Sequence, residues 1–82
     1  MNESRIIAQN PKNKEELHLV DLNTEALFAY ILDEELRRTQ EFDIPKEDYQ
    51  RALTSSKNPF EALVKVFQSY DLGLELLDFE AI

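Results

Sequence analysis

The feature that most restricts the fold of this chain is a capped amphipathic segment in its second half. Asn58 precedes Pro59, and Glu61 follows Asn58 by three residues. This arrangement satisfies the free amide groups at the start of a helix. Apolar residues then recur at spacings of three and four, as one face of a helix requires: Phe60, Leu63, Val64 and Phe67. The pattern predicts a helix from 59 to about 70.

Two further helices are predicted upstream. Asn23 or Thr24 can cap a helix, and apolar residues with helical spacing follow, which predicts a helix over 24–40. Pro45 interrupts this pattern, because proline disfavours a helical conformation at the preceding residue and suits the first turn of a new helix. A short helix over 45–53 is therefore predicted, and the polar residues 54–57 end it as a loop.

The remaining segments are shorter. Residues 1–14 show no sustained periodicity and are interpreted as a flexible N-terminal arm. Alternating apolar residues predict a short strand over 16–22, and a second alternation around Gly73 predicts a terminal strand over 72–77. The expected fold class is mainly α: a compact three-helix domain over 15–82 with a short C-terminal β-strand.

Length and composition limit the kind of protein this can be. A chain of 82 residues has room for one domain with a modest core, so we expect it to gain stability from a homodimer or another partner. The chain has no cysteine, which excludes a disulfide framework and a thiolate metal site and fits a cytoplasmic protein. No apolar run approaches the roughly 18–20 residues that span a bilayer, so no membrane association is expected.

The sequence shows no catalytic, metal-binding or cofactor-binding motif. His18, the only histidine, lies in the predicted strand without a partner and is interpreted as an ordinary, partly exposed side chain. The acidic run 33–35 is interpreted as a solvated helix face, because successive helical residues point in different directions. A single glycine excludes a glycine-rich phosphate loop. Three tyrosines beside apolar stripes are expected at the edge of the core: Tyr30, Tyr49 and Tyr70. We expect a protein that binds another macromolecule and is not an enzyme.

The charge is large and uneven. The formal net charge is −8, which repels polyphosphate and attracts a basic partner. Five of the nine Lys and Arg residues nevertheless lie within 37–57, whereas residues 58–82 carry a single lysine. The least acidic part of the chain is therefore where two predicted helices meet.

The run from Ile44 to Leu76, IPKEDYQRALTSSKNPFEALVKVFQSYDLGLEL, resembles the C-terminal half of the addiction-module antidote proteins. These are antitoxins with a repressor-type helix-turn-helix. The order is a recognition helix, an Asn-Pro cap, an amphipathic helix and a Leu-Gly-Leu ending, over about 40% of the chain. The resemblance implies a helix-turn-helix-like domain whose recognition helix is 45–53. It further implies six residues that contact DNA. Those in the major groove are Lys46, Gln50 and Arg51, and those near phosphates are Ser55, Ser56 and Lys57.

The upstream half departs from the pattern of that family. Thr39 and Asp43 stand where such proteins have a small residue and a glycine, and Glu47 and Asp48 place negative charge on the recognition helix. Two functions therefore remain open. One is an antitoxin-like transcriptional regulator that binds a DNA operator and a toxin protein. The alternative is an acidic protein-binding adaptor or inhibitor that docks on a basic partner and does not bind DNA.

Overall fold

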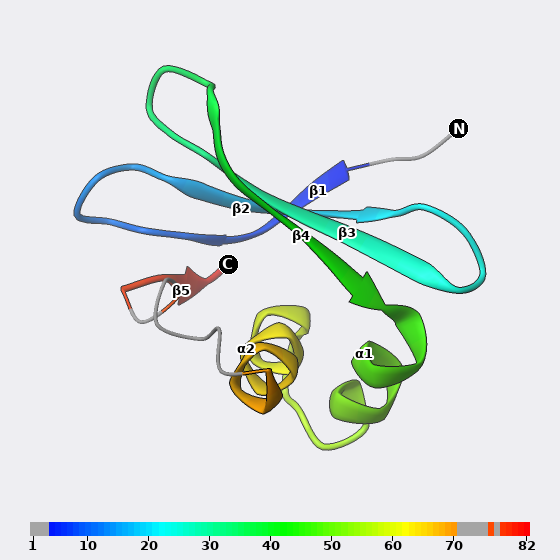
Figure 1. The fold of residues 1–82 in the computed structure, drawn as a ribbon. Coiled ribbons are helices and arrows are strands. Elements are labelled where there is room, and N and C mark those ends of the chain that lie inside the picture. Colours follow the sequence, from blue (N-terminus) through cyan, green and yellow to red (C-terminus); the bar gives the residue numbers. More distant parts are fainter. Residues whose placement is uncertain (1–3, 71–75, 77) are drawn as a thin grey trace.

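The computed structural model describes residues 4–70, 76 and 78–82. The elements of this part of the chain, in order, are β1 Ser4–Gln9, β2 Glu16–Asp21, β3 Ala26–Leu32, β4 Arg38–Pro45, α1 Lys46–Leu53, α2 Pro59–Ser69 and β5 Glu80–Ala81. The strands form one antiparallel sheet in the order β4-β3-β2-β1-β5. Both helices lie on the same side of this sheet (Figure 1). The other side carries no described helix.

The predicted fold class is wrong. A mainly α, compact three-helix domain was expected, and a helix-turn-helix-like arrangement was implied, but the described chain is mainly β with two helices. The difference comes from the helix predicted over 24–40, which is replaced by β3, a turn and the first part of β4.

The apolar run in β3 explains that error. Residues 26–32 read Ala-Leu-Phe-Ala-Tyr-Ile-Leu, and a short continuous apolar run does not by itself distinguish a strand from a segment of buried helix. Leu27 and Ile31 point to the helix side and enter the core, whereas Phe28 and Tyr30 alternate to the other side. Pairing with β2 and β4 on either side satisfies the backbone of this strand, so tertiary context outweighs the local helical spacing.

The turn between β3 and β4 is organised by Asp33. Its carboxylate accepts hydrogen bonds from the backbone amides of Glu35 and Arg37, both at 2.9 Å. The bond from the Arg37 amide is the largest cause that holds the pKa of Asp33 below its ordinary value of 3.8. Leu36 completes the turn with a positive φ of 66°. The acidic run 33–35 thus lies in a turn instead of on a helix face.

Both ends of the described chain join the sheet. β1 pairs with β2 on one side and with β5 on the other, where Ala8 lies opposite Ala81. Residues 4–9 of the expected arm therefore form an inner strand. The strand predicted over 16–22 is confirmed as β2. The strand predicted over 72–77 lies outside the described residues except for Leu76, which is buried.

The helices predicted over 45–53 and 59–70 are confirmed as α1 and α2. The Asn58 side chain accepts a hydrogen bond from the Glu61 amide at 2.8 Å, as the cap pattern predicts. Helix α1 follows Pro45 directly and has no side-chain cap. Neither of these described helices is long and apolar enough to cross a membrane.

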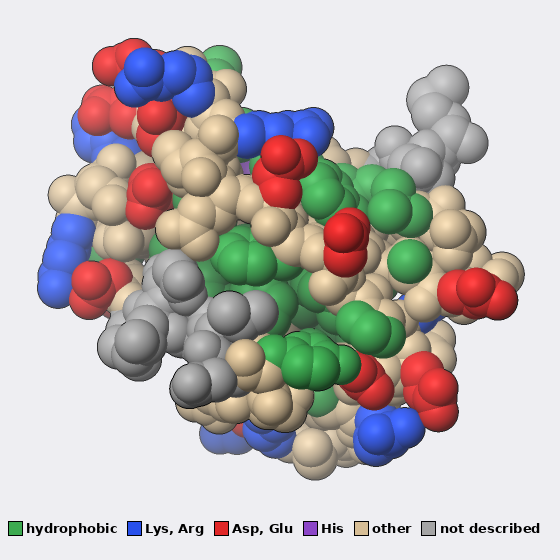
Figure 2. Space-filling view, in the orientation of Figure 1, with side chains coloured by type: hydrophobic (Ala, Val, Ile, Leu, Met, Phe, Trp, Pro, Cys, Tyr) green, Lys and Arg blue, Asp and Glu red, His purple; other side chains and the backbone are tan. Residues whose placement is uncertain are grey.

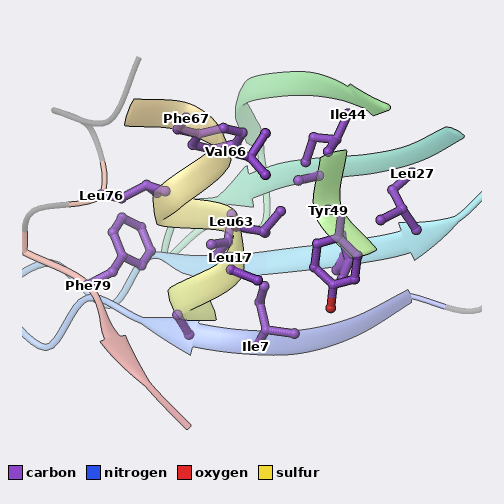
Figure 3. Packing of buried hydrophobic residues seen from close by; sticks show 14 of the residues in the cluster. Ile7, Leu17, Leu27, Ile44, Tyr49, Leu63, Val66, Phe67, Leu76 and Phe79 are labelled. Atoms are coloured by element: carbon purple, nitrogen blue, oxygen red, sulfur yellow. The ribbon is translucent and has the colours of Figure 1, made fainter. Parts of the chain in front are cut away.

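The core lies between the sheet and the two helices (Figure 3). Its largest fully buried side chains are Leu17, Ile31 and Ile44 from three strands and Leu63 from α2. Burying a side chain of this size stabilises the fold by about 1.5–3 kcal/mol. Tyr49 joins them from α1 with 6% of its surface exposed. All of this packing is on one side of the sheet, which leaves the opposite side available.

Candidate functional site

The residues predicted to contact DNA lie on α1 and in the loop after it. Lys46 begins α1, and its Nζ lies 2.8 Å from the Asp21 carboxylate and donates to the Asn23 carbonyl at 3.2 Å. Gln50 is exposed and lies one turn later on the same side of the helix. The ammonium group of Lys46 is therefore tied to the connection between β2 and β3.

The other predicted contacts face elsewhere. Arg51 donates to the Glu47 carboxylate at 3.1 Å. The hydroxyls of Ser55 and Ser56 both donate to the Ala52 carbonyl and so help to end α1. Lys57 is exposed in the loop. Lys46 and Gln50 line one surface pocket, whereas Arg51 and Ser55 line another. The structure therefore places Lys46 and Gln50 at a different pocket from Arg51 and Ser55.

Most of the cationic side chains are held by carboxylates of the same chain. All nine Lys and Arg residues are within the described part, and seven of them form ion pairs there: Lys12, Lys14, Arg37, Arg38, Lys46, Arg51 and Lys65. Figure 2 shows the same arrangement, since most Lys and Arg side chains in that view lie beside Asp or Glu. Such exposed pairs add little stability, about 0–1 kcal/mol each. Because of these ion pairs, few Lys and Arg side chains in the described part of the chain are free to contact a phosphate group.

The side of the sheet without helices forms the second surface of interest, here called the open face. Its residues follow from the strand register, because directly paired residues point to the same side. Ile6, His18, Tyr30 and Glu41 form one row across β1 to β4, and Val20, Phe28 and Asp43 form the neighbouring row. Glu16 and Arg38 border these rows.

The centre of the open face is a stack of three flat side chains. The rings of His18 and Tyr30 lie 5.0 Å apart and are nearly parallel, at 9°. The Arg38 guanidinium lies 4.2 Å from the centre of the Tyr30 ring, a cation–π distance. These neighbours bury Tyr30 to 7% exposure and His18 to 9%. The stack gives the open face a rigid aromatic centre.

His18 is more buried than the sequence suggests. Its Nε2 lies 3.2 Å from the Glu16 carboxylate, while its Nδ1 is buried and has no partner among the described residues. The sequence predicts a partly exposed His18 because no partner lies near it in the chain, and Tyr30 is twelve residues away. Only the register of β2 against β3 reveals the contact. Sequence reasoning placed Phe28 on the apolar face of the helix predicted over 24–40 and assigned no site role to Arg38.

Charge on the open face is unbalanced. Glu16, Glu41 and Asp43 are opposed by the single guanidinium of Arg38, which pairs with Glu41 at 3.3 Å. Asp43 is exposed and forms no ion pair with any described residue. The open face therefore combines half-buried apolar side chains with excess negative charge.

The described residues do not converge as an active site would require. No group of three or more His, Asp or Glu side chains in this part of the chain could hold a metal ion. The one carboxylate hydrogen-bonded to His18 comes from the same strand, and no described nucleophile shares that contact.

Comparison of the chain with models of known protein families, with curated proteins and with solved structures gives no significant match.

Proposed function

We propose that this chain is a non-enzymatic, cytoplasmic adaptor or inhibitor that docks on a basic protein through its open face. The observation that carries the proposal is the excess of carboxylates around an aromatic centre on a sheet face that no described helix covers. The net charge of −8 adds long-range attraction for a basic partner.

The chemistry of the open face defines the partner more closely. Phe28 and Val20 are half-buried, and Ile6 is 39% exposed, so the rows across the sheet offer apolar contact as well as charge. A segment in which Lys or Arg alternates with apolar residues fits this surface, because its cations meet Asp43 and Glu16 while its apolar side chains cover Phe28. Mixed surfaces of this kind form the interfaces of many non-obligate complexes.

DNA binding by α1 is less well supported than protein binding. Lys46 and Arg51 already form ion pairs, so each would have to exchange a carboxylate of its own chain for a phosphate. The protein as a whole is negatively charged and would repel DNA, whose binding depends on cations that are free to contact phosphates. On the open face, Asp43 forms no ion pair with a described residue and needs no such exchange to meet a basic protein.

A peptide that alternates lysine and leucine is a suitable probe. Titrated into the ¹⁵N-labelled protein, it should shift the amide resonances of β2, β3 and β4 and leave those of α2 in place. Added salt should weaken binding, because steering between exposed charges is screened beyond about 8 Å at physiological ionic strength. A peptide that alternates glutamate and leucine should not bind.

Charge reversal on the open face gives the decisive comparison. Asp43→Lys should weaken binding of the lysine–leucine peptide by about tenfold, equivalent to roughly 1.4 kcal/mol. Glu25→Lys makes the same charge change at an exposed site between β2 and β3 and should have a much smaller effect. Equal effects of the two variants would mean that only net charge matters and would overturn the assignment to the open face. Tight binding of duplex DNA that Arg51→Ala abolishes would replace the proposal with the DNA-binding function.

A further inference from the structure

A pocket between α1 and the sheet lies on the helix side of the molecule. The pocket has a volume of about 570 Å³, within the range of roughly 300–1,000 Å³ typical of small-molecule sites. Helix α1 contributes Lys46, Tyr49, Gln50 and Leu53, which share one side because they are spaced by three and four residues. Arg5 of β1 forms part of the facing wall.

The hydroxyl of Tyr49 is the unusual group in this pocket. The side chain is 6% exposed, and its hydroxyl is buried without a hydrogen-bond partner among the described residues. Figure 3 shows the ring projecting from α1 with the hydroxyl directed toward β1. A buried hydroxyl left unpaired costs about 1–3 kcal/mol, so buried polar groups nearly always have a partner. The Tyr49 hydroxyl is thus closed off from solvent beside the Arg5 side chain, and a ligand reaches it only if that side chain moves.

The local charge of the pocket is positive although the protein is acidic. Arg5 forms no ion pair with another described residue, whereas Lys46 is already neutralised by Asp21. The two carboxylates in the first turn of α1 face away, since Glu47 bonds to Arg51 and Asp48 accepts from the Tyr70 hydroxyl. Charges more than about 8–10 Å away are largely screened at ordinary ionic strength. Asp21 also lines the pocket, where Lys46 balances its charge, so Arg5 is left as the excess charge that an anion would meet there.

These features together define one class of ligand. We propose that the pocket binds a small aliphatic carboxylate, whose two oxygens accept hydrogen bonds from the Arg5 guanidinium and the Tyr49 hydroxyl. A guanidinium fork matches the two oxygens of a carboxylate, and one negative charge balances Arg5, whose guanidinium has no carboxylate partner among the described residues. The hydrocarbon tail lies against the leucine side of the wall, where Leu53 is 37% exposed.

Calorimetric titration of the whole protein with hexanoate tests the proposal. Hexanoate should bind with a dissociation constant of about 1 mM, close to −4 kcal/mol, as suits a ligand of few atoms. Hexanol tests whether the carboxylate is required, and acetate tests whether the tail is required. Both should bind at least tenfold more weakly. Equal binding of hexanol, or tighter binding of inorganic phosphate, would overturn the assignment.

Variants separate the pocket from a general charge effect. Arg5→Gln should weaken the binding of hexanoate by about tenfold or more, because it removes a charge-assisted hydrogen bond. Lys57→Gln removes the same charge from an exposed loop and should leave the affinity unchanged. Tyr49→Phe keeps the ring in the core and should weaken binding about fivefold while the protein remains folded. Unchanged affinity in both Arg5→Gln and Tyr49→Phe would refute the site. The open face lies on the other side of the sheet, so the proposed function would be unaffected.

Discussion

Leu36 and Tyr49 occupy settings in this fold that their own chemistry does not favour. Leu36 adopts a left-handed backbone conformation in the β3–β4 turn, with φ at 66°, although 73% of its side chain is exposed and contributes little packing. Tyr49 buries a hydroxyl without a described partner. Both settings lower stability in a way that a single substitution can relieve, and each leads to a prediction.

Leu36→Gly should stabilise the protein. The left-handed conformation costs a residue with a β-carbon about 1–2 kcal/mol, and glycine avoids this at the expense of about 0.5–1 kcal/mol of chain entropy. We expect a net gain of about 0.5–1 kcal/mol in the free energy of unfolding, measured by urea denaturation. Leu36→Ala keeps the β-carbon and is the matched control. If alanine stabilises the protein as much as glycine does, backbone strain at this position is not the cause.

Tyr49→Phe should change stability most clearly at alkaline pH. Burial raises the pKa of Tyr49 above its ordinary value of 10.0, and the nearby Arg5 guanidinium partly opposes the rise. The folded state therefore holds the phenolic proton more tightly than the unfolded state. The resulting stability is fully present below pH 10 and is lost as the pH rises from there through the raised pKa of the folded state.

The measurement is urea denaturation of the wild type and the variant between neutral pH and pH 11. Near pH 7 the variant should be more stable by about 1 kcal/mol, because it removes an unpaired buried hydroxyl. The alkaline loss of stability should be smaller in Tyr49→Phe than in the wild type. Tyr70→Phe is the control, because Tyr70 is half-exposed and its hydroxyl donates to Asp48. A gain at neutral pH in the control as well would contradict this interpretation.

At the scale of elements, the two helices begin in different ways. Helix α2 has a side-chain cap from Asn58 and a proline in its first turn, whereas α1 follows Pro45 with no side-chain cap. Helix α1 instead gains a hydrogen bond from the Lys46 amide to the Glu25 carbonyl, which ties it to the sheet. Helix α2 therefore depends on its own sequence for its start, and α1 depends on tertiary contacts.

Asn58→Ala should destabilise the protein by about 1 kcal/mol, the usual cost of losing a side-chain cap. Thermal and urea denaturation measure the change. Asn58→Asp keeps an acceptor for the Glu61 amide and adds a charge that suits the helix N-terminus, so its stability should match or exceed that of the wild type. Loss of stability in both variants would show that the asparagine acts through some contact other than the cap.

The same contrast explains which elements could be predicted from the sequence. Helix α2 carries its signals locally, in the cap and in the apolar spacing, and the prediction is confirmed. Strand β3 carries an apolar run that fits a helix or a buried strand equally well, and only its pairing with β2 and β4 decides the outcome. Local patterns therefore located α1, α2 and β2, and failed where the backbone partners are distant.

The candidate site was predictable to a smaller extent. The cations of α1 were visible in the sequence, but their carboxylate partners were not, since Asp21 lies twenty-five residues before Lys46. Which residues form the open face depends on which side of each strand faces the helices. That choice requires the register of four strands, and no local motif contains it. The DNA-contact assignments and the resemblance to antidote proteins remain predictions.

At the scale of the whole molecule, β5 links the end of the described chain to its beginning. The Ile82 amide donates to the Ile7 carbonyl, and Phe79 just before β5 is 6% exposed. This short strand covers the outer edge of β1, which would otherwise present unpaired backbone groups to solvent. Residues 79–82 therefore contribute to the core and to the sheet together.

Phe79→Ala should cost about 3–5 kcal/mol in the free energy of unfolding, the usual range for a buried phenylalanine. For a domain this small, that is a large part of the total stability. Ile82→Ala is the control, because the Ile82 side chain is 72% exposed and its backbone bond survives the change, so its effect should stay within about 0.5 kcal/mol. Similar small effects of both variants would mean that β5 unfolds separately from the rest.

The stack on the open face has a practical consequence for spectroscopy. The chain contains no tryptophan, so its near-ultraviolet absorption and dichroism come from three tyrosines and five phenylalanines. Tyr30 lies between an imidazole and a guanidinium, Tyr49 is buried beside the pocket, and Tyr70 is half-exposed at the end of α2. Each chromophore thus reports on a different surface. Occupancy of either proposed site should be readable optically, without any attached label.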